Sequence, residues 1–164
     1  MKTTIEQLAE HHFEQLHRVA DQVARERRYL AMLEAPPVEH CYSFYREILA
    51  SGQCHVVVHD GTVVGWCDVT PVFGESRRHV GTLGIGLLPA FRGSGVGFEL
   101  MKSAIEVAWA RGLSRIELTV REDNLSAKAL YERLGFAHEG VKRDSMLVDD
   151  RYYDCYAMAL LRDR

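Results

Sequence analysis

The stretch Arg92-Gly-Ser-Gly-Val-Gly97 lies between a predicted strand and a predicted amphipathic helix. Glycines let backbone N–H groups gather around a phosphate at the positive end of a helix, so this turn is a candidate anion site. It is not a Walker loop, because no Lys-Ser/Thr pair follows its last glycine. It also departs from the dinucleotide fingerprint, because Phe98 stands where that pattern needs its third glycine. ATP hydrolysis and NAD binding are therefore disfavoured, and a plain tight turn is the alternative reading.

Hydrophobic periodicity after and around this turn predicts a strand, helix, strand unit, followed by a helix and a hairpin. The predicted elements are a strand at 79–88 stopped by Pro89, a helix from Val96 to Arg111-Gly112, a strand at 114–120, a helix at 126–134 closed by Gly135, and strands at 136–146 and 151–161 joined by a turn at Asp149-Asp150.

The amino-terminal part reads as a strand, two helices and a hairpin with an Asp-Gly turn. Its predicted elements are a strand at 3–8, a helix at 12–28, a loop at 29–37 that contains Pro36-Pro37, a helix at 38–50 closed by Ser51-Gly52, and strands at 54–59 and 62–69 around Asp60-Gly61. Together these patterns predict one mixed α/β domain over residues 1–164, without repeats or linkers.

Composition favours a folded protein that acts on a small diffusible substrate. Apolar residues make up 47% and charged residues 26%, and the formal net charge is −3, with no basic cluster that would indicate nucleic acid or a membrane as partner. The absence of a signal-peptide pattern and of a long apolar run leads us to expect a cytoplasmic protein. The four widely spaced cysteines, Cys41, Cys54, Cys67 and Cys155, are predicted to be reduced thiols, and no metal site is expected.

Two motifs in combination resemble the signatures of the GNAT superfamily of N-acetyltransferases. The first is Arg92-Gly-Ser-Gly-Val-Gly97, which matches R/Q-x-x-G-x-G/A and follows Leu87-Leu88-Pro89; the second is Asn124-Leu-Ser-Ala-Lys-Ala-Leu-Tyr131 with Leu-Gly135-Phe136 after it. The resemblance covers about residues 53–161. It implies a central, mostly antiparallel sheet of six to seven strands, splayed at the acyl-CoA site and flanked by about four helices. Residues 53–161 would form the acyl-CoA core and residues 1–52 the variable acceptor side.

The resemblance implies acetyl-CoA as co-substrate, with its pyrophosphate on the glycine turn and its pantetheine arm beside the end of the preceding strand. The cofactor-binding residues it implies are Leu87, Leu88, Arg92, Gly93, Ser94, Gly95, Val96, Gly97, Asn124, Lys128 and Tyr131. Two of these have plain structural alternatives. Asn124 is a good helix N-cap, and Tyr131 can be a core tyrosine with a satisfied hydroxyl.

The implied chemistry is direct attack of a neutral amine on the thioester, which needs an oxyanion donor, an acid and a base. A backbone N–H near Leu87 is the candidate donor, and Tyr131 is the candidate acid for the leaving thiolate. The strand from Gly81 to Leu87 lacks the acidic residue that some family members carry there. Asp68 and His79 are therefore the candidate bases, acting through a water, although solvated strand-end residues are an equal alternative.

The acceptor is expected to be a small amine, because the Glu-Ala-Pro-Pro37 loop and the last hairpin resemble the branch that acetylates free amino acids and phosphinothricin-type amines. Tyr29 and Glu34 are the candidate acceptor residues, with Arg143 or Arg151 for a substrate carboxylate. One alternative is a protein N-terminal or lysine acetyltransferase, and another is a sensor module that binds acyl-CoA without catalysis. A homodimer is expected.

Overall fold

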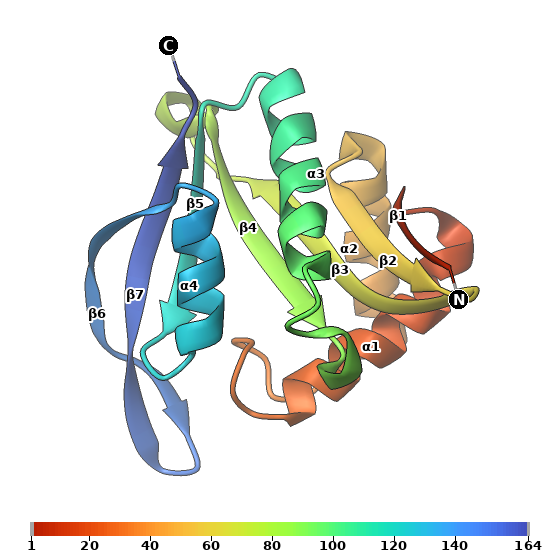
Figure 1. Ribbon diagram of the computed structural model, residues 1–164, viewed down its shortest axis with the longest axis horizontal. Coiled ribbons are helices and arrows are strands. Elements are labelled where there is room, and N and C mark those ends of the chain that lie inside the picture. Colours follow the sequence, from red (N-terminus) through yellow and green to blue (C-terminus); the bar gives the residue numbers. More distant parts are fainter. Residues whose placement is uncertain (1, 164) are drawn as a thin grey trace.

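A computed structural model of the chain describes residues 2–163 and shows seven strands in one sheet, in the order β1-β2-β3-β4-β5-β7-β6 (Figure 1). Neighbouring strands are antiparallel, except for the parallel pair β4 and β5. The predicted mostly antiparallel sheet is confirmed. The strands are β1 Thr3–Gln7, β2 Cys54–His59, β3 Thr62–Pro71, β4 Val80–Leu87, β5 Arg115–Arg121, β6 Ala137–Val148 and β7 Arg151–Leu161.

Four α-helices cover the two faces of this sheet, as predicted. They are α1 Phe13–Arg25, α2 Val38–Ser51, α3 Val96–Ala110 and α4 Leu125–Arg133. In Figure 1 α3 and α4 pass in front of the strands, whereas α2 lies behind them. The packing agrees, because one buried cluster joins the sheet to α3 and α4, and a second joins it to α1 and α2.

Side chains of strand β3 pack into both buried clusters. Trp66 packs in the cluster of α1 and α2, while its neighbour Cys67 and then Val69 pack in the cluster of α3. Successive side chains of a strand point to opposite faces, so a strand that is buried on both faces reads as a nearly continuous apolar run. This is the pattern of Val63 to Val69.

Strands β4 and β5 pair over a short distance and then separate. Their register covers only Val80–Thr82 against Arg115–Glu117, and the remainder of β4 has no partner on that side within the described chain. Figure 1 shows the two strands diverging, with α4 in front of β5. The splayed sheet that the family resemblance implied is therefore present between β4 and β5.

One predicted boundary was wrong in a way that matters for the site. Helix α1 ends at Arg25 and not at Arg28, because Arg27 has a φ of 57° in the left-handed region and so leaves the helix. Periodicity could not show this, since the side chains of residues 26–28 bind partners far away in the sequence. The other α-helices and strands lie within two residues of their predicted ends.

The structure also bears on the state of the cysteines and on membrane-spanning segments. The four cysteines are buried and form no disulfide. Among the described residues no helix combines the length and the apolar character needed to cross a membrane.

Glycines on β4 let side chains of β3 lie across it. Trp66 pairs in register with Gly86, and a Cβ at Gly86 would lie 2.3 Å from the Trp66 ring. Asp68 pairs with Gly84, and a Cβ there would lie 3.3 Å from its Oδ2. Trp66 is buried, so it has little room to move away from an added methyl group.

We predict that Gly86→Ala lowers the free energy of unfolding by about 1–3 kcal/mol, because the methyl group overpacks against the Trp66 ring. Urea denaturation followed by circular dichroism measures this. Gly84→Ala is the matched control on the same strand and face, and its looser contact predicts a smaller loss. Equal unfolding midpoints for Gly86→Ala and the wild type would contradict the overpacking.

Candidate active site

A cavity of about 330 Å³ opens where β4 and β5 separate. Its wall comes from both sides of the sheet, since Val23 and Tyr29 belong to α1 and the loop after it, whereas Tyr131 belongs to α4. The other lining residues are Ile85, Gly86, Leu87, Arg92, Gly93, Gly95, Gly97, Phe98, Asn124, Ser126, Ala127, Ala129, Leu130 and Arg133. The two motifs singled out in the sequence thus meet in one place.

The glycine turn presents backbone donors to this cavity. Gly93 and Gly95 have φ values of 70° and 87°, which only glycine adopts without strain. The first backbone bond at this end of α3 runs from the Glu99 N–H to the Gly95 carbonyl, and no carbonyl in the described chain accepts from the N–H groups of residues 93–98. These donors and the helix dipole suit the turn to bind an anion.

Arg92 lies at the turn, but its guanidinium already has partners. Its Nε donates to the Leu87 carbonyl at 2.9 Å, and its two terminal nitrogens bind the Glu26 carboxylate at 2.9 and 2.5 Å. The same group lies 4.5 Å from the centre of the Tyr29 ring. Hydrogen bonding to Glu26 raises the pKa of Arg92. The structure therefore gives Arg92 protein partners, where the sequence led us to expect a cofactor ligand.

Arg133 is a cavity residue that the sequence reasoning missed. It stands in the last turn of α4, lines the cavity and stacks 5.0 Å from the Phe98 ring. Among the described residues it has no ion-pair partner. In a sequence, a basic residue at the carboxyl terminus of a helix is explained by its favourable interaction with the helix dipole. Only the position of Arg133 at the cavity makes it a candidate for ligand binding.

The free edge of β4 faces the cavity. The Leu88 N–H donates to the Val64 carbonyl on β3, and successive backbone groups of a strand point in alternate directions. The N–H groups of Ile85 and Leu87 therefore point toward the side from which β5 has separated. The Leu88 N–H is consumed within the sheet, so of the two predicted leucines only Leu87 offers its N–H to the cavity.

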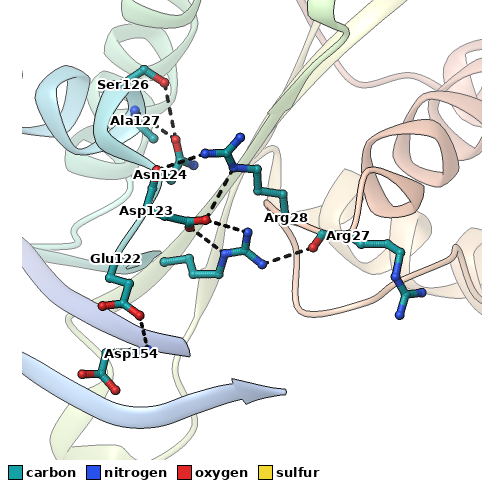
Figure 2. A network of polar contacts seen from close by, with 9 residues as sticks. Arg27, Arg28, Glu122, Asp123, Asn124, Ser126, Ala127 and Asp154 are labelled. Carbon is teal, nitrogen blue, oxygen red and sulfur yellow. Dashed lines mark hydrogen bonds and ion pairs between the residues drawn. The ribbon is translucent and has the colours of Figure 1, made fainter. Parts of the chain in front are cut away.

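The structure confirms that Asn124 is a helix N-cap and leaves its amide available for the predicted ligand role. It is the N-cap of α4, and its side-chain oxygen accepts from the Ala127 N–H at 3.3 Å and from the Ser126 hydroxyl at 3.4 Å (Figure 2). The capping uses only the oxygen. Since Asn124 also lines the cavity, its amide NH₂ remains as a donor for a ligand.

Tyr131 lies at the floor of the site. Only 7% of it is exposed, and its hydroxyl has no hydrogen-bond partner within the described chain. Burial, with a smaller contribution from Cys67, raises the pKa of Tyr131. The hydroxyl is therefore protonated at neutral pH and can donate a hydrogen bond into the cavity.

Asp68 lies on the far side of β4 from Tyr131, beside Gly84. Its Oδ2 accepts a hydrogen bond from the Trp66 indole N–H at 3.2 Å, and no cation pairs with Asp68 in the described residues. Burial raises the pKa of Asp68 to about 7, against a small opposing effect of that bond. The carboxyl group occupies the space that a side chain at position 84 would take.

The structure does not bring the other predicted site residues into the cavity. His79 is exposed and lies just before β4 begins, beside Glu75, Ser76 and Arg78. The extended strand places it about 26 Å from Leu87, which lies at the other end of β4. Glu34 is a surface residue paired with Arg25 at 3.3 Å.

Lys128, a predicted cofactor residue, pairs with Glu132 and lies over the Tyr156 ring. The side chains of Ser94 and Val96 also do not line the cavity, and the Ser94 hydroxyl donates to the Phe91 carbonyl.

Neither of the arginines proposed for a substrate carboxylate lines the cavity. Arg143 lies exposed on β6, and Arg151 stacks 4.8 Å from the Tyr153 ring. Tyr29, by contrast, is in the cavity wall as predicted.

The loop after α1 is tied to the β5–α4 turn by the network of Figure 2. The buried Arg121 binds the Asp123 carboxylate at 2.7 and 2.9 Å and donates to the Arg27 carbonyl at 3.1 Å. Arg28 donates to the Asp123 carbonyl at 3.2 Å. Contact with Arg121 lowers the pKa of Asp123, so this carboxylate stays charged.

The same loop reaches the last hairpin. Arg27 binds both carboxylate oxygens of Asp149, at 2.7 and 3.2 Å, in the turn between β6 and β7. The loop, whose Tyr29 lines the cavity, is therefore joined to the hairpin between β6 and β7.

A separate cluster of Glu6, His11 and His12 has the proximity of a metal site. His12 Nδ1, however, accepts the Ala9 N–H at 3.0 Å, which leaves the proton of the neutral ring on Nε2 facing Glu6. A metal ligand needs a free lone pair on that nitrogen, so this tautomer opposes metal binding.

Comparison with known proteins gives the family of the chain. The model described as the acetyltransferase (GNAT) family matches residues 11–136. An L-amino acid N-acetyltransferase, AaaT of Escherichia coli, is 36% identical over 63% of this chain and 64% of its own length. A Bacillus subtilis protein named as an alanine N-acetyltransferase of ribosomal protein bS18 is 30% identical over 62% of this chain and 66% of its own. The chain thus matches just under two thirds of each relative.

Solved structures match over nearly the whole chain. The acetyltransferase yncA of Salmonella typhimurium, solved with its cofactor acetyl-CoA, has a TM-score of 0.91 at 17% identity, over 98% of this chain and 94% of that one. At this identity the match shows the fold, which is the same splayed sheet with its helices.

Proposed function

The chain belongs to the acetyltransferase (GNAT) family, and we propose that it transfers an acetyl group from acetyl-CoA to the primary amine of a small molecule, an amino acid or a related amine. The amine attacks the thioester directly. The observation that carries the choice of a small acceptor is the Arg27–Asp149 contact, which joins the loop after α1, whose Tyr29 lines the cavity, to the β6–β7 turn.

The residues present fit acetyl-CoA. The unpaired N–H groups at positions 93–98 and the guanidinium of Arg133 suit a pyrophosphate, and the Asn124 amide and the free edge of β4 suit the amide-rich pantetheine arm. Bound there, acetyl-CoA supplies the acetyl group as an activated thioester. This fit agrees with the family and with the cofactor in the Salmonella structure.

The first contribution of the chain is orientation. A cavity with walls from both faces of the sheet holds the two substrates in contact, which removes much of the entropic part of the barrier. The Leu87 N–H points into the same opening and donates to the oxygen on which negative charge develops. A donor fixed in a strand needs no reorganisation when that charge appears.

The second contribution is removal of the amine proton. Asp68 with a pKa of about 7 is half ionised at neutral pH, which suits a general base at that pH. It lies behind Gly84 and outside the cavity lining, so we place one water between Asp68 and the amine. Asp68 on β3 thus supplies the acid that β4 lacks.

The third contribution is protonation of the sulfur. Tyr131 has a free hydroxyl at the cavity floor, and its raised pKa keeps it protonated. The same dry surroundings raise the proton affinity of a thiolate formed beside it, as burial does for the neighbouring thiol of Cys67. Burial therefore raises the proton affinity of both the Tyr131 oxygen and the leaving sulfur, so the proton can pass between groups of similar affinity.

The test is a thiol-release assay with acetyl-CoA and a panel of free amino acids, polyamines and short peptides, together with calorimetry of CoA. We expect turnover with a free amine and none with peptides, because the Arg27–Asp149 contact ties the loop after α1 to the hairpin, and a bound polypeptide would have to separate them. Turnover with peptides alone would replace the proposal by protein acetylation, as in the ribosomal-protein relative. CoA binding without any turnover would indicate the sensor.

We predict that Asp68→Asn lowers kcat by about 100-fold at pH 7 and abolishes the rise of the rate around pH 7. It should also stabilise the fold at pH 8. With a pKa of about 7 when folded and about 4 when unfolded, wild-type Asp68 binds more protons in the folded state, so stability falls as pH rises through this interval. Asparagine has no such cost, and melting curves at pH 5 and pH 8 measure the difference. A variant less stable than the wild type at pH 8 would refute the buried charge.

Tyr131→Phe should lower kcat by about 100-fold while CoA binds with unchanged affinity, because only the hydroxyl proton is removed. Turnover and calorimetry on the same preparation check this. Tyr152→Phe is the matched control, since Tyr152 is 59% exposed on the last hairpin and does not line the cavity. Unchanged turnover of Tyr131→Phe would remove Tyr131 from the acid role.

A further inference from the structure

Two arginines line the cavity near the glycine turn, and their surroundings differ. Arg92 has three of its N–H groups bound within the protein, and its charge is matched by the two oxygens of Glu26. The guanidinium of Arg133 has neither a hydrogen bond nor an ion pair among the described residues, and its only recognised contact is with the Phe98 ring. Only one of the two is therefore available to a phosphate without breaking existing contacts.

The partners of Arg92 belong to the acceptor side of the molecule. Glu26 and Tyr29 flank the start of the loop after α1, and Tyr29 forms part of the cavity wall. The third partner is the carbonyl of Leu87, at the end of β4. Arg92 thus joins the last residue of β4 to the loop that faces the amine.

The opposite wall of the opening holds the same loop. Arg28 contacts Asp123, and Arg121 donates to the Arg27 carbonyl, both next to Asn124 (Figure 2). The four residues from Glu26 to Tyr29 are therefore fixed at the glycine turn on one side and at the start of α4 on the other. A loop held at two points has few positions open to it, which is how a binding wall is preorganised.

We propose that Arg92 is a positioning residue for the amine site and not a ligand of the pyrophosphate, whose negative charge is met by the backbone N–H groups of the turn and by Arg133. Turning Arg92 toward a phosphate would leave the half-buried Glu26 carboxylate and the Leu87 carbonyl without their donor. The inference rests on the proposed function, because it names the wall that receives the amine.

Three variants separate the two roles. In Arg92→Gln we expect the KM for the amine to rise by about tenfold and the CoA dissociation constant to stay within about twofold, since a tenfold change corresponds to one strong contact. Glu26→Gln should reproduce this, because it breaks the same pair from the other end. Arg133→Gln, also an arginine at the cavity, should instead raise the CoA dissociation constant by about tenfold, by loss of a cation at the phosphates.

A readout independent of turnover is trypsin cleavage after Arg27 and Arg28, identified by mass spectrometry. Arg92→Gln and Glu26→Gln should raise the rate of this cleavage by about fivefold because they release the loop, whereas Arg133→Gln should leave it unchanged. Melting curves show whether each variant is folded.

Weaker CoA binding in Arg92→Gln, with normal CoA binding in Glu26→Gln, would make Arg92 a phosphate ligand and overturn the inference. Unchanged cleavage in both variants would overturn it as well. A wild-type protein that binds CoA but acetylates no amine would refute the proposed function, while cleavage and calorimetry would still decide what Arg92 binds.

Discussion

The short pairing of β4 with β5 is the constraint on which the site depends. Had the parallel pair continued beyond Thr82, the backbone groups of Leu83, Ile85 and Leu87 would have been used within the sheet. Separation leaves polar groups at the edge of a buried opening, and such groups need partners. Arg92 provides one for the Leu87 carbonyl, and the others remain for a ligand. The sheet stays intact because β5 pairs along its whole length with β7 on the other side.

The glycines of β4 are the second requirement, because they allow residues of β3 to act across the strand. Gly86 accommodates the Trp66 ring and Gly84 accommodates the Asp68 carboxyl group. The indole N–H donates to this carboxyl group and so fixes its position. Since no cation among residues 2–163 pairs with Asp68, burial destabilises its carboxylate, and this is the physical origin of its pKa near neutrality. An aspartate on the surface would cost the folded protein less stability, but with its ordinary pKa it would be a much weaker base.

The sequence predicted the fold well because its signals were local. Alternation along β3, the Asp-Gly turn and the glycine-rich turn each report on a few neighbouring residues, and the order of elements followed from them. The motif residues Gly95, Asn124 and Tyr131, which the sequence assigned to one site, line one cavity. His79 was misplaced because a residue at the start of a strand lies far from the end of that strand. Arg133 was missed and the partners of Arg92 were not foreseen, because both depend on contacts between distant segments.

Those distant contacts explain why the acceptor is harder to read than the cofactor. The glycine turn is a continuous segment, so a short sequence motif is enough to identify it. The amine wall is held by Arg92 with Glu26, Arg28 with Asp123, and Arg27 with Asp149, pairs separated by 66, 95 and 122 residues. A change in any one partner can move the wall without altering the motif. The names of the two curated relatives, one for an amino acid and one for a ribosomal protein, fit this separation of roles. Under the proposed function, acceptor choice would depend on these tertiary contacts more than on the glycine motif.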